Sequence, residues 1–243
     1  TDAALITSGT LTAYDVDTSD TVVATKVNNV SVSGSLNTND PQSILTANGI
    51  TNADLIAMFG VTGGNPDNAA QSAENGIDWD FNSNGEAFDF IPVGETLILT
   101  YQVLGTDSQG ATTSKDVTIT ITGANDGVSA IDDSNAVVED SNVAGNVLDN
   151  DTLDPDFNQT TTVNSFTLDS NGNGSQESFS AGDTVSITSD GSTVIGSFTL
   201  NSDGGYSFTP ALNYSGPVPV VTYLMGSGAN TDSASLTLDI TPV

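Results

Sequence analysis

The stretch Val117-Thr118-Ile119-Thr120-Ile121-Thr122 alternates apolar and hydroxyl side chains at every position. Successive side chains of a β-strand point to opposite faces of the sheet, so this stretch predicts a strand with one buried and one solvated face. Clusters of Gly, Asn and Asp separate further runs of this kind, a pattern typical of antiparallel β-sandwiches. The other alternating runs are Ile6 to Tyr14, Thr21 to Val32, Thr96 to Val103, Thr184 to Ile187, Val194 to Leu200 and Ser235 to Ile240.

The end of the chain, Leu236-Thr237-Leu238-Asp239-Ile240-Thr241, repeats this strand pattern. Two closing strands of one kind, at mid-chain and at the end, indicate tandem units. A length of 243 residues suits two domains of ordinary size, and the turn-rich segment 123–127 separates them. We therefore expect an all-β chain of two tandem Ig-like or cadherin-like antiparallel sandwiches, residues 1–126 and 127–243.

A different periodicity interrupts the first domain between residues 41 and 60. Leu45, Leu55 and Ile56 recur here at helical spacing in the segments 41–50 and 51–60. Asn52 is a suitable N-cap and Gly60 a suitable helix end. We expect a short helical insertion near residues 41–60, packed over one end or edge of the first sandwich.

Charge and composition exclude several classes of function. The chain has 31 acidic residues, two basic residues and a net charge of −29, with neither His nor Cys. These counts exclude a thiol nucleophile, a disulfide, a Cys or His zinc site and a Ser-His-Asp triad. Two lysines among so many acids also argue against binding to nucleic acid or to an anionic membrane. No apolar run is long enough to span a bilayer, and the start at Thr1 without a signal peptide predicts a fragment of a larger secreted protein.

Several segments resemble repeat domains of giant bacterial adhesins. The second half resembles cadherin-like tandem repeats, and the first half resembles the VCBS-type repeat of RTX-type adhesins that leave the cell by type I secretion. In the second half the similar segments are Asp132-Asp133, 147–151, 204–216 and 221–223; in the first half they are 9–17, 94–97 with Tyr101, 107–110 and 121–126.

The resemblance implies an Ig-like extender module at the bacterial cell surface, used in adhesion and biofilm formation, with calcium at or near domain junctions. Two features depart from the family pattern. The insertion at 41–60 is larger than a plain spacer needs, and the glycine-rich nonapeptide repeat of calcium β-rolls is absent.

Oxygen-bearing side chains at the predicted strand ends have the chemistry that Ca²⁺ requires, namely six to eight oxygen ligands. Two carboxylates about 4 Å apart repel by about 4 kcal/mol at an effective dielectric near 20, and a divalent cation converts that repulsion into attraction. Metal binding and folding would then be coupled. We therefore expect Ca²⁺ as the bound cofactor.

The first predicted calcium site is the domain junction. The loop after the first strand is expected at the same end as the last residue of the domain, which would bring Asp15 and Asp17 near Asn125 and Asp126. The alternative is a solvated turn and a flexible linker. Two carboxylates of the next domain, Asp132 and Asp133, are expected to complete or adjoin this site.

Further predicted ligands lie in three loops, two of which have a structural alternative. One set is expected at the far end of the second domain, with Asx capping or turns as the alternative. A second begins like an EF-hand loop but lacks its position-twelve Glu, and a polar hairpin loop is the alternative. Asp107 is expected near Asp2, for a junction with an upstream domain. The first set is Asn150, Asp151, Asp154 and Asp156, and the second is Asp169, Asn171 and Asn173.

Three classes of function are compared. Catalysis by paired carboxylates, as in glycosidases, requires two acids in distinct environments, and no pair here stands out, so we expect no enzyme. An extracellular, monomeric extender would have the adjacent repeat domains of its own chain as partners. A calcium-dependent module that binds host or biofilm peptides or glycans near residues 41–67 is the alternative.

Overall fold

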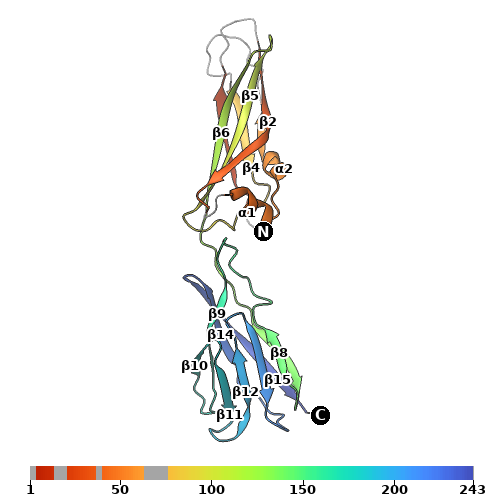
Figure 1. Ribbon diagram of the computed structural model, residues 1–243, viewed down its shortest axis with the longest axis vertical. Helices are drawn as coiled ribbons and strands as arrows, with labels where there is room; N and C mark the ends of the chain where they lie inside the picture. The colour runs from red at the N-terminus through yellow and green to blue at the C-terminus, as the bar shows by residue number, and fades with distance from the viewer. Residues whose placement is uncertain (1–3, 14–20, 37–39, 63–75, 243) are drawn as a thin grey trace. The chain divides into compact units, whose positions relative to one another are not determined.

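The computed structural model describes residues 4–13, 21–36, 40–62 and 76–242. The chain divides into two compact units, Thr1–Asn125 (unit 1) and Asp126–Val243 (unit 2), one residue before the expected boundary. Each unit consists of two packed β-sheets, so the expected all-β sandwich architecture is confirmed (Figure 1). Within the described ranges, no helix has the length and apolarity needed to cross a bilayer.

The described part of unit 1 forms two antiparallel sheets of three strands each. The first has the order β1-β4-β3 and the second has the order β2-β5-β6. Aromatic side chains fill the space between them, since Phe59 stacks on Tyr101 at a ring distance of 4.4 Å and Phe81 lies beside the same tyrosine. The strands are β1 (Ile6–Thr12), β2 (Val22–Gly34), β3 (Phe59–Thr62), β4 (Gly76–Asn82), β5 (Thr96–Asp107) and β6 (Thr112–Thr122).

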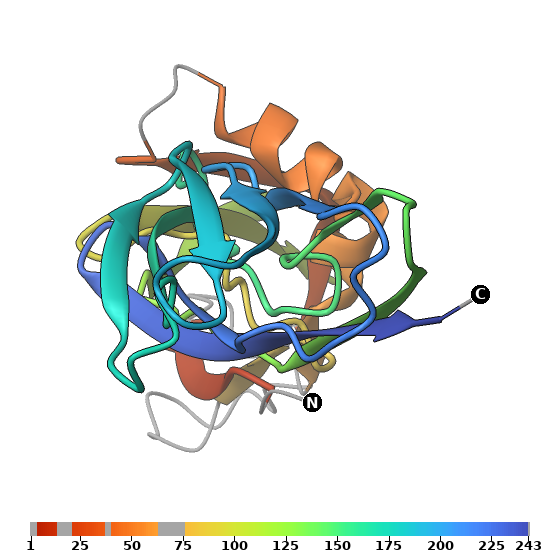
Figure 2. The ribbon, with the colours of Figure 1, turned by 90° about the horizontal axis from the view of Figure 1, so that it is seen from below.

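The expected helical insertion is confirmed, with two local corrections. It forms α1 (Pro41–Ala47) and α2 (Asn52–Ala57), which lie beside β2 (Figure 2). Thr51, not Asn52, caps α2, because its side chain and that of Asp54 form a reciprocal capping box. Gly60 does not end this helix but belongs to β3.

The insertion is part of the core of unit 1. Leu45 and Leu55 are fully buried, and the Tyr101 hydroxyl donates to the Leu55 carbonyl at 2.8 Å. The Lys26 ammonium donates to the carbonyls of Ile56 and Phe59 at 2.8 and 2.6 Å, respectively. Hydrogen bonds from a charged donor are stronger than neutral ones, so one of the two lysines fixes α2 to the sheet edge.

Unit 2 is a larger sandwich, with nine strands in its described residues, 126–242. One sheet has the order β10-β9-β14-β15-β7, and the other has the order β11-β12-β13-β8. All pairs are antiparallel except β15 with β7, which are parallel. The strands are β7 (Asp133–Val138), β8 (Val143–Asn146), β9 (Thr162–Leu168), β10 (Glu177–Ser180), β11 (Thr184–Thr188), β12 (Val194–Leu200), β13 (Gly205–Pro210), β14 (Val221–Ser227) and β15 (Asn230–Thr241).

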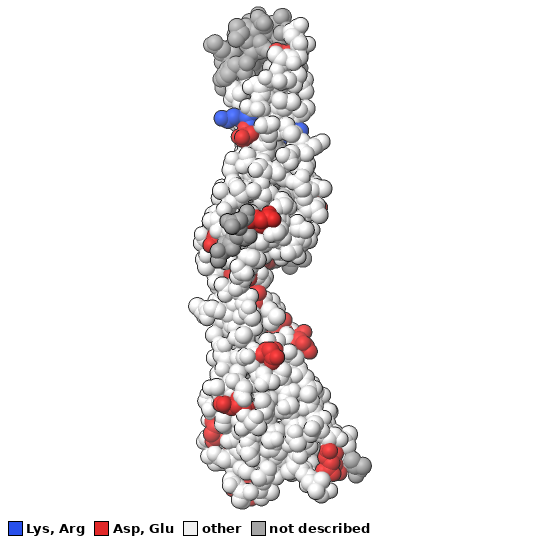
Figure 3. All heavy atoms as spheres, in the orientation of Figure 1, with Lys and Arg blue, Asp and Glu red and all other residues white. Residues whose placement is uncertain are grey.

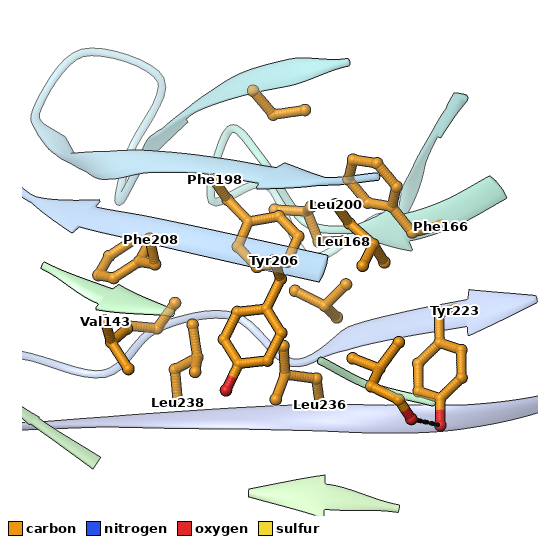
Figure 4. Close-up of a cluster of buried hydrophobic side chains, with 14 of the residues drawn as sticks. Val143, Phe166, Leu168, Phe198, Leu200, Tyr206, Phe208, Tyr223, Leu236 and Leu238 are labelled. Carbon is orange, nitrogen blue, oxygen red and sulfur yellow. Dashed lines mark hydrogen bonds between the residues drawn. The ribbon is translucent and has the colours of Figure 1, made fainter. Parts of the chain in front are cut away.

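The core of unit 2 lies between these sheets and is built from the alternating residues that the sequence predicts (Figure 4). Phe166 packs edge-on against Phe198 at 5.6 Å, and Leu236 and Leu238 of β15 face this cluster. Tyr223 is also fully buried, with its hydroxyl at one end of the cluster.

The chain reverses direction between β7 and β8. Asp140, in the turn, has a φ of 65°, a left-handed conformation that Asp tolerates better than most residues. Its carboxylate accepts a hydrogen bond from the backbone N–H of Asn213 at 2.6 Å, which holds the turn. Because of this reversal, the end of β8 returns to the place where β7 begins.

Candidate functional site

Several oxygen atoms of unit 2 converge on one hydroxyl group, that of Tyr223 on β14. Its oxygen lies 3.2 Å from the carbonyl oxygens of both Ile131 and Val147. It also lies 3.2 and 3.0 Å from the two carboxylate oxygens of Asp151. Four acceptor atoms from two separate segments therefore surround a single side chain.

A phenol has one hydrogen to donate, so it satisfies one of these acceptors at a time. Burial raises the pKa of Tyr223 well above its usual range, and the nearby charges of Asp133 and Asp151 raise it further. The hydroxyl therefore keeps its proton, and the four acceptor atoms around it outnumber the one hydrogen that it donates. An excess of oxygen atoms in a partly buried place favours a cation.

The carboxyl group of Asp133, at the start of β7, adds to this excess. Its Oδ2 atom is buried and has no hydrogen-bond partner among the described residues. Burial raises the pKa of Asp133 to about 6, and the charges of Asp151, Asp132 and Asp149 act in the same direction. The Tyr223 hydroxyl opposes this shift without offsetting it.

Hydrogen bonds between side chains and backbone hold the two acidic segments of the site together. The N–H of Ile131 donates to Asp151 at 2.7 Å, and the Asn150 amide donates to the carbonyl of Asp132 at 3.2 Å. The carboxylate of Asp132 accepts the backbone N–H of Ser235 on β15 at 2.8 Å. We call residues 131–133, 147–151 and Tyr223 the Tyr223 site.

The position of Asn150 and Asp151 corrects the sequence-based expectation. They were expected at the far end of the second domain from Asp132 and Asp133, but hydrogen bonds join the two pairs of residues. That expectation required the chain to run from one end of the domain to the other between residues 127 and 148, without reversing direction. The chain instead turns back at Asp140, so two predicted sites merge into one.

Asp154 and Asp156 lie in the loop that follows, also near the start of unit 2. This loop adjoins the first residues of the unit because Thr152 pairs with Ser129 in an isolated antiparallel bridge. The carboxylate of Asp154 accepts the backbone N–H of Asp156 at 2.9 Å, which is the Asx-turn alternative for this residue. The side chain of Asp156 is buried. Calcium binding by these two residues stays a prediction.

The loop from Asp169 to Gly174 is held by its own polar groups. The carboxylate of Asp169 accepts the N–H groups of Asn173 and Gly174 at 3.1 and 2.8 Å. The Asn171 amide donates to Glu177 at 2.7 Å, and the carbonyl oxygen of the Asn173 side chain accepts the N–H of Ser175. These contacts suit the polar hairpin alternative, and calcium binding here stays a prediction.

The geometric premise of the predicted junction site is wrong. The start of β1 borders a cavity with residues 119–122, and its end borders another with residues 111–115. β1 therefore runs opposite to β6, and the loop after β1 begins at the end of unit 1 remote from Asn125. Asp15 and Asp17 themselves lie outside the described residues, and the carbonyl of Asp126 accepts the side-chain amide of Asn230 at 2.6 Å.

Asp107 holds the turn between β5 and β6. Its carboxylate accepts the N–H groups of Gln109 and Ala111 at 2.9 and 2.7 Å. It lies near Ala13, beyond the end of β1, because both line one cavity of about 640 Å³. The expectation that Asp107 lies at the end of the domain where the chain starts is therefore also wrong, since β1 runs toward Asp107.

Acidic groups elsewhere are dispersed. On the face in Figure 3, uncharged surface separates the Asp and Glu side chains. Across the described ranges, no three carboxylates lie close enough to hold a metal ion by themselves. A cation at the Tyr223 site would therefore take carbonyl and water oxygens as well as the two carboxylates of Asp133 and Asp151.

Besides the backbone carbonyls of Ile131 and Val147, two polar side chains of the site were not predicted as functional. In the sequence, Tyr223 was singled out as part of the segment 221–223 that resembles cadherin-like repeats; it is fully buried, and its hydroxyl is the centre of the site. Asp149 lies inside the segment 147–151 and acts on Asp133 through its charge. The spacing of three acidic or amide side chains at 149–151 was the available signal.

Comparison with protein families gives a match in the second half of the chain. The model described as a cadherin-like domain matches residues 176–241, which lie within unit 2. Unit 2 is therefore similar to cadherin-like domains over that part of the chain. A comparison with curated proteins found no match.

Comparison with solved structures finds multi-domain chains at low similarity. The four N-terminal Ig domains of Dscam1 isoform 6.9 align with a TM-score of 0.30 and 10% identity, over 68% of this chain and 37% of that one. The titin domains Z1Z2 in complex with telethonin align at 0.27 and 10%, over 100% and 98% of the two chains. An endo-fucoidan hydrolase of glycoside hydrolase family 107 aligns at 0.29 and 10%, over 96% and 27%. Likeness at these scores assigns no function.

Proposed function

We propose that this chain is a structural extender segment of an extracellular adhesion protein, and that Ca²⁺ bound at the Tyr223 site stabilises unit 2. The excess of acceptor oxygens around the single Tyr223 proton carries the proposal. The buried, unpartnered Oδ2 of Asp133 supports it, because an ionised carboxyl group in such a place is costly without a cation.

The residues present fit the chemistry of calcium. Carboxylates of Asp133 and Asp151 and backbone carbonyls of Ile131 and Val147 are hard oxygen ligands, and water completes such a shell. The positive charge of the ion would balance the negative charges of Asp133 and Asp151. It would also interact favourably with the oxygen end of the Tyr223 hydroxyl dipole. The hydroxyl of Tyr223 would then need to satisfy fewer oxygen atoms.

The site connects elements that are distant in the sequence. It joins the residues before β7, the residues after β8 and the middle of β14. A cation shared among them would fix the start of the unit to its core, so that unfolding would require release of the ion. This is the property that a spacer under tension needs.

The remaining parts of the proposal follow from composition. A charge of −29 keeps neighbouring copies apart in solution, which suits a monomeric segment at a crowded cell surface. The partners would be the neighbouring domains of the same polypeptide and, through them, host or biofilm ligands. The resemblance to type I-secreted adhesins supports the extracellular location.

The alternative of a peptide- or glycan-binding module near residues 41–67 receives no support from the insertion. Ile44, Leu45 and Leu55 of the two helices are buried in unit 1, and residues 63–67 lie outside the described part of the chain. A glycan and peptide array probed with and without Ca²⁺ separates the two functions. A saturable, calcium-dependent signal would favour the binding module.

Titration calorimetry of the whole chain with Ca²⁺, in buffer stripped of metal, tests the proposed site. We expect saturable heat and a melting temperature of unit 2 that falls on adding chelator. Asp151→Asn should abolish the heat assigned to this site. Asp239→Asn removes the same charge from an exposed position on β15 and should leave it unchanged. Equal heats for both variants would refute the site.

A further inference from the structure

The two units share one arrangement of six strands. In unit 1, β2-β5-β6 form one sheet and β1-β4-β3 form the other. In unit 2, β9-β14-β15 and β8-β13-β12 are paired in the same order and in the same sequence along the chain. β1 therefore corresponds to β8, and β6 corresponds to β15.

Unit 2 has a strand that the described part of unit 1 lacks. β7 precedes β8 and pairs in parallel with the outer edge of β15, from Leu236 opposite Asp133 to Thr241 opposite Val138. Among the described residues, β6 pairs only with β5, so no described strand covers its other edge. An uncovered edge presents a row of backbone N–H and C=O groups that can accept another strand.

A cavity lies where the equivalent of β7 would run. It has a volume of about 280 Å³ and is lined by residues 5–7 of β1 and its approach, Phe81, and residues 119–122 of β6. Ile6, an apolar residue on its rim, is 71% exposed. Matched from the strand ends, residues 119–122 correspond to 238–241, which pair with residues 135–138 of β7.

We propose that the groove between β1 and β6 is the docking site of one additional β-strand, which runs parallel to β6 and is supplied by polypeptide joined ahead of Thr1. A strand parallel to β6 is antiparallel to β1 and therefore ends beside Leu5, next to the start of β1. In unit 2, four residues, 139–142, suffice to connect β7 to β8. The direction of the groove thus favours an occupant on the same chain over one from another molecule.

The groove also defines the chemistry of its occupant. Alternate side chains must be apolar and of valine size to enter the cavity above Phe81, as Val137 of β7 is buried in unit 2. The solvent-facing positions should be hydroxyl or neutral side chains, because this chain already carries a charge of −29. A second copy of the chain meets like charge at the same edge.

The test extends the whole chain by ten residues ahead of Thr1. The extension copies residues 133–142, which are β7 and its turn, with the acidic residues replaced by threonine and serine. A control extension carries proline and aspartate in place of the Ala136 and Val137 equivalents, which removes a ladder N–H and the apolar side chain. Amide hydrogen exchange is measured by NMR at residues 117–122, for the original chain and both extended chains.

We expect the outward-facing amides of residues 117–122 to exchange about tenfold more slowly with the extension, the ratio that corresponds to one net hydrogen bond. The control extension should leave them unchanged. Equal rates in all three chains would overturn the proposal. So would equal protection by the same ten residues added as a free peptide at micromolar concentration, or protection of the original chain that rises with its own concentration, since these outcomes assign the groove to another molecule.

Discussion

Replacing Asp133 by asparagine should have opposite effects on stability in the absence and in the presence of calcium. Asparagine keeps the shape of the side chain and removes the charge that burial disfavours. A pKa of about 6 in the folded state, against 3.8 in the unfolded chain, corresponds to about 3 kcal/mol at pH 7 before screening. Because the carboxyl group is only partly buried, we discount this to about 1 kcal/mol.

In chelator at pH 7, Asp133→Asn should therefore raise the melting temperature of unit 2 by about 4 °C. The advantage should vanish below about pH 4, because the carboxyl group is then neutral in both folded and unfolded chains. The folded-state pKa is raised, so the stability of the original chain relative to this variant falls as pH rises from about 4 to 6. Differential scanning calorimetry at pH 4 and pH 7 measures both values.

With calcium the sign should reverse. At a free concentration of about 100 times Kd, bound Ca²⁺ stabilises the original chain by about 2.7 kcal/mol. A variant that cannot bind Ca²⁺ lacks this stabilisation but keeps the gain of about 1 kcal/mol from removal of the buried charge. It should therefore melt about 7 °C below the original chain. Asp239→Asn is the matched control. An equal shift of Asp133→Asn in chelator and in calcium would refute the assignment of Asp133 as a ligand.

Three further changes test the contacts described above. Lys26→Met removes two charge-assisted hydrogen bonds to the end of α2 and should destabilise unit 1 by about 2–3 kcal/mol in urea unfolding, whereas Lys115→Met should not. Tyr223→Phe leaves the surrounding oxygens without their donor and should destabilise unit 2 by about 1–2 kcal/mol in chelator, by the same measurement. Asp54→Asn should weaken unit 1 at pH 7 but not at a pH below the lowered pKa of Asp54, because hydrogen bonds from Thr51 favour the ionised carboxylate and their stabilisation is lost as pH falls from 3.8 through that lowered pKa. Thermal melts at both pH values decide this last case.

Side-chain alternation was sufficient to predict most of the fold. The run 194–200 coincides with β12, and the run starting at Thr96 begins β5, because these strands bury one face and solvate the other. Short strands such as β8 and β10 were not predicted, since alternation over only four residues also occurs by chance outside strands.

The candidate site was predicted in its residue types but not in its geometry. Asp132, Asp133, Asn150 and Asp151 were all identified as ligands, yet they were divided between opposite ends of the domain. This placement was wrong because the chain reverses direction at Asp140, between the two pairs of residues. A turn made by a single left-handed residue does not change the hydrophobic pattern enough to be predicted from it.

The parallel pairing of β7 with β15 has a mechanical consequence. These strands are the first and the last of unit 2, with six residue pairs from Leu236 with Asp133 to Thr241 with Val138. Tension applied to the two ends of the unit pulls them along their length in opposite directions. All the bonds of the ladder are then strained in shear at once, whereas an antiparallel pair pulled from one end opens like a zipper, one bond after another. The unit is thus arranged to rupture abruptly at high force instead of peeling apart at low force.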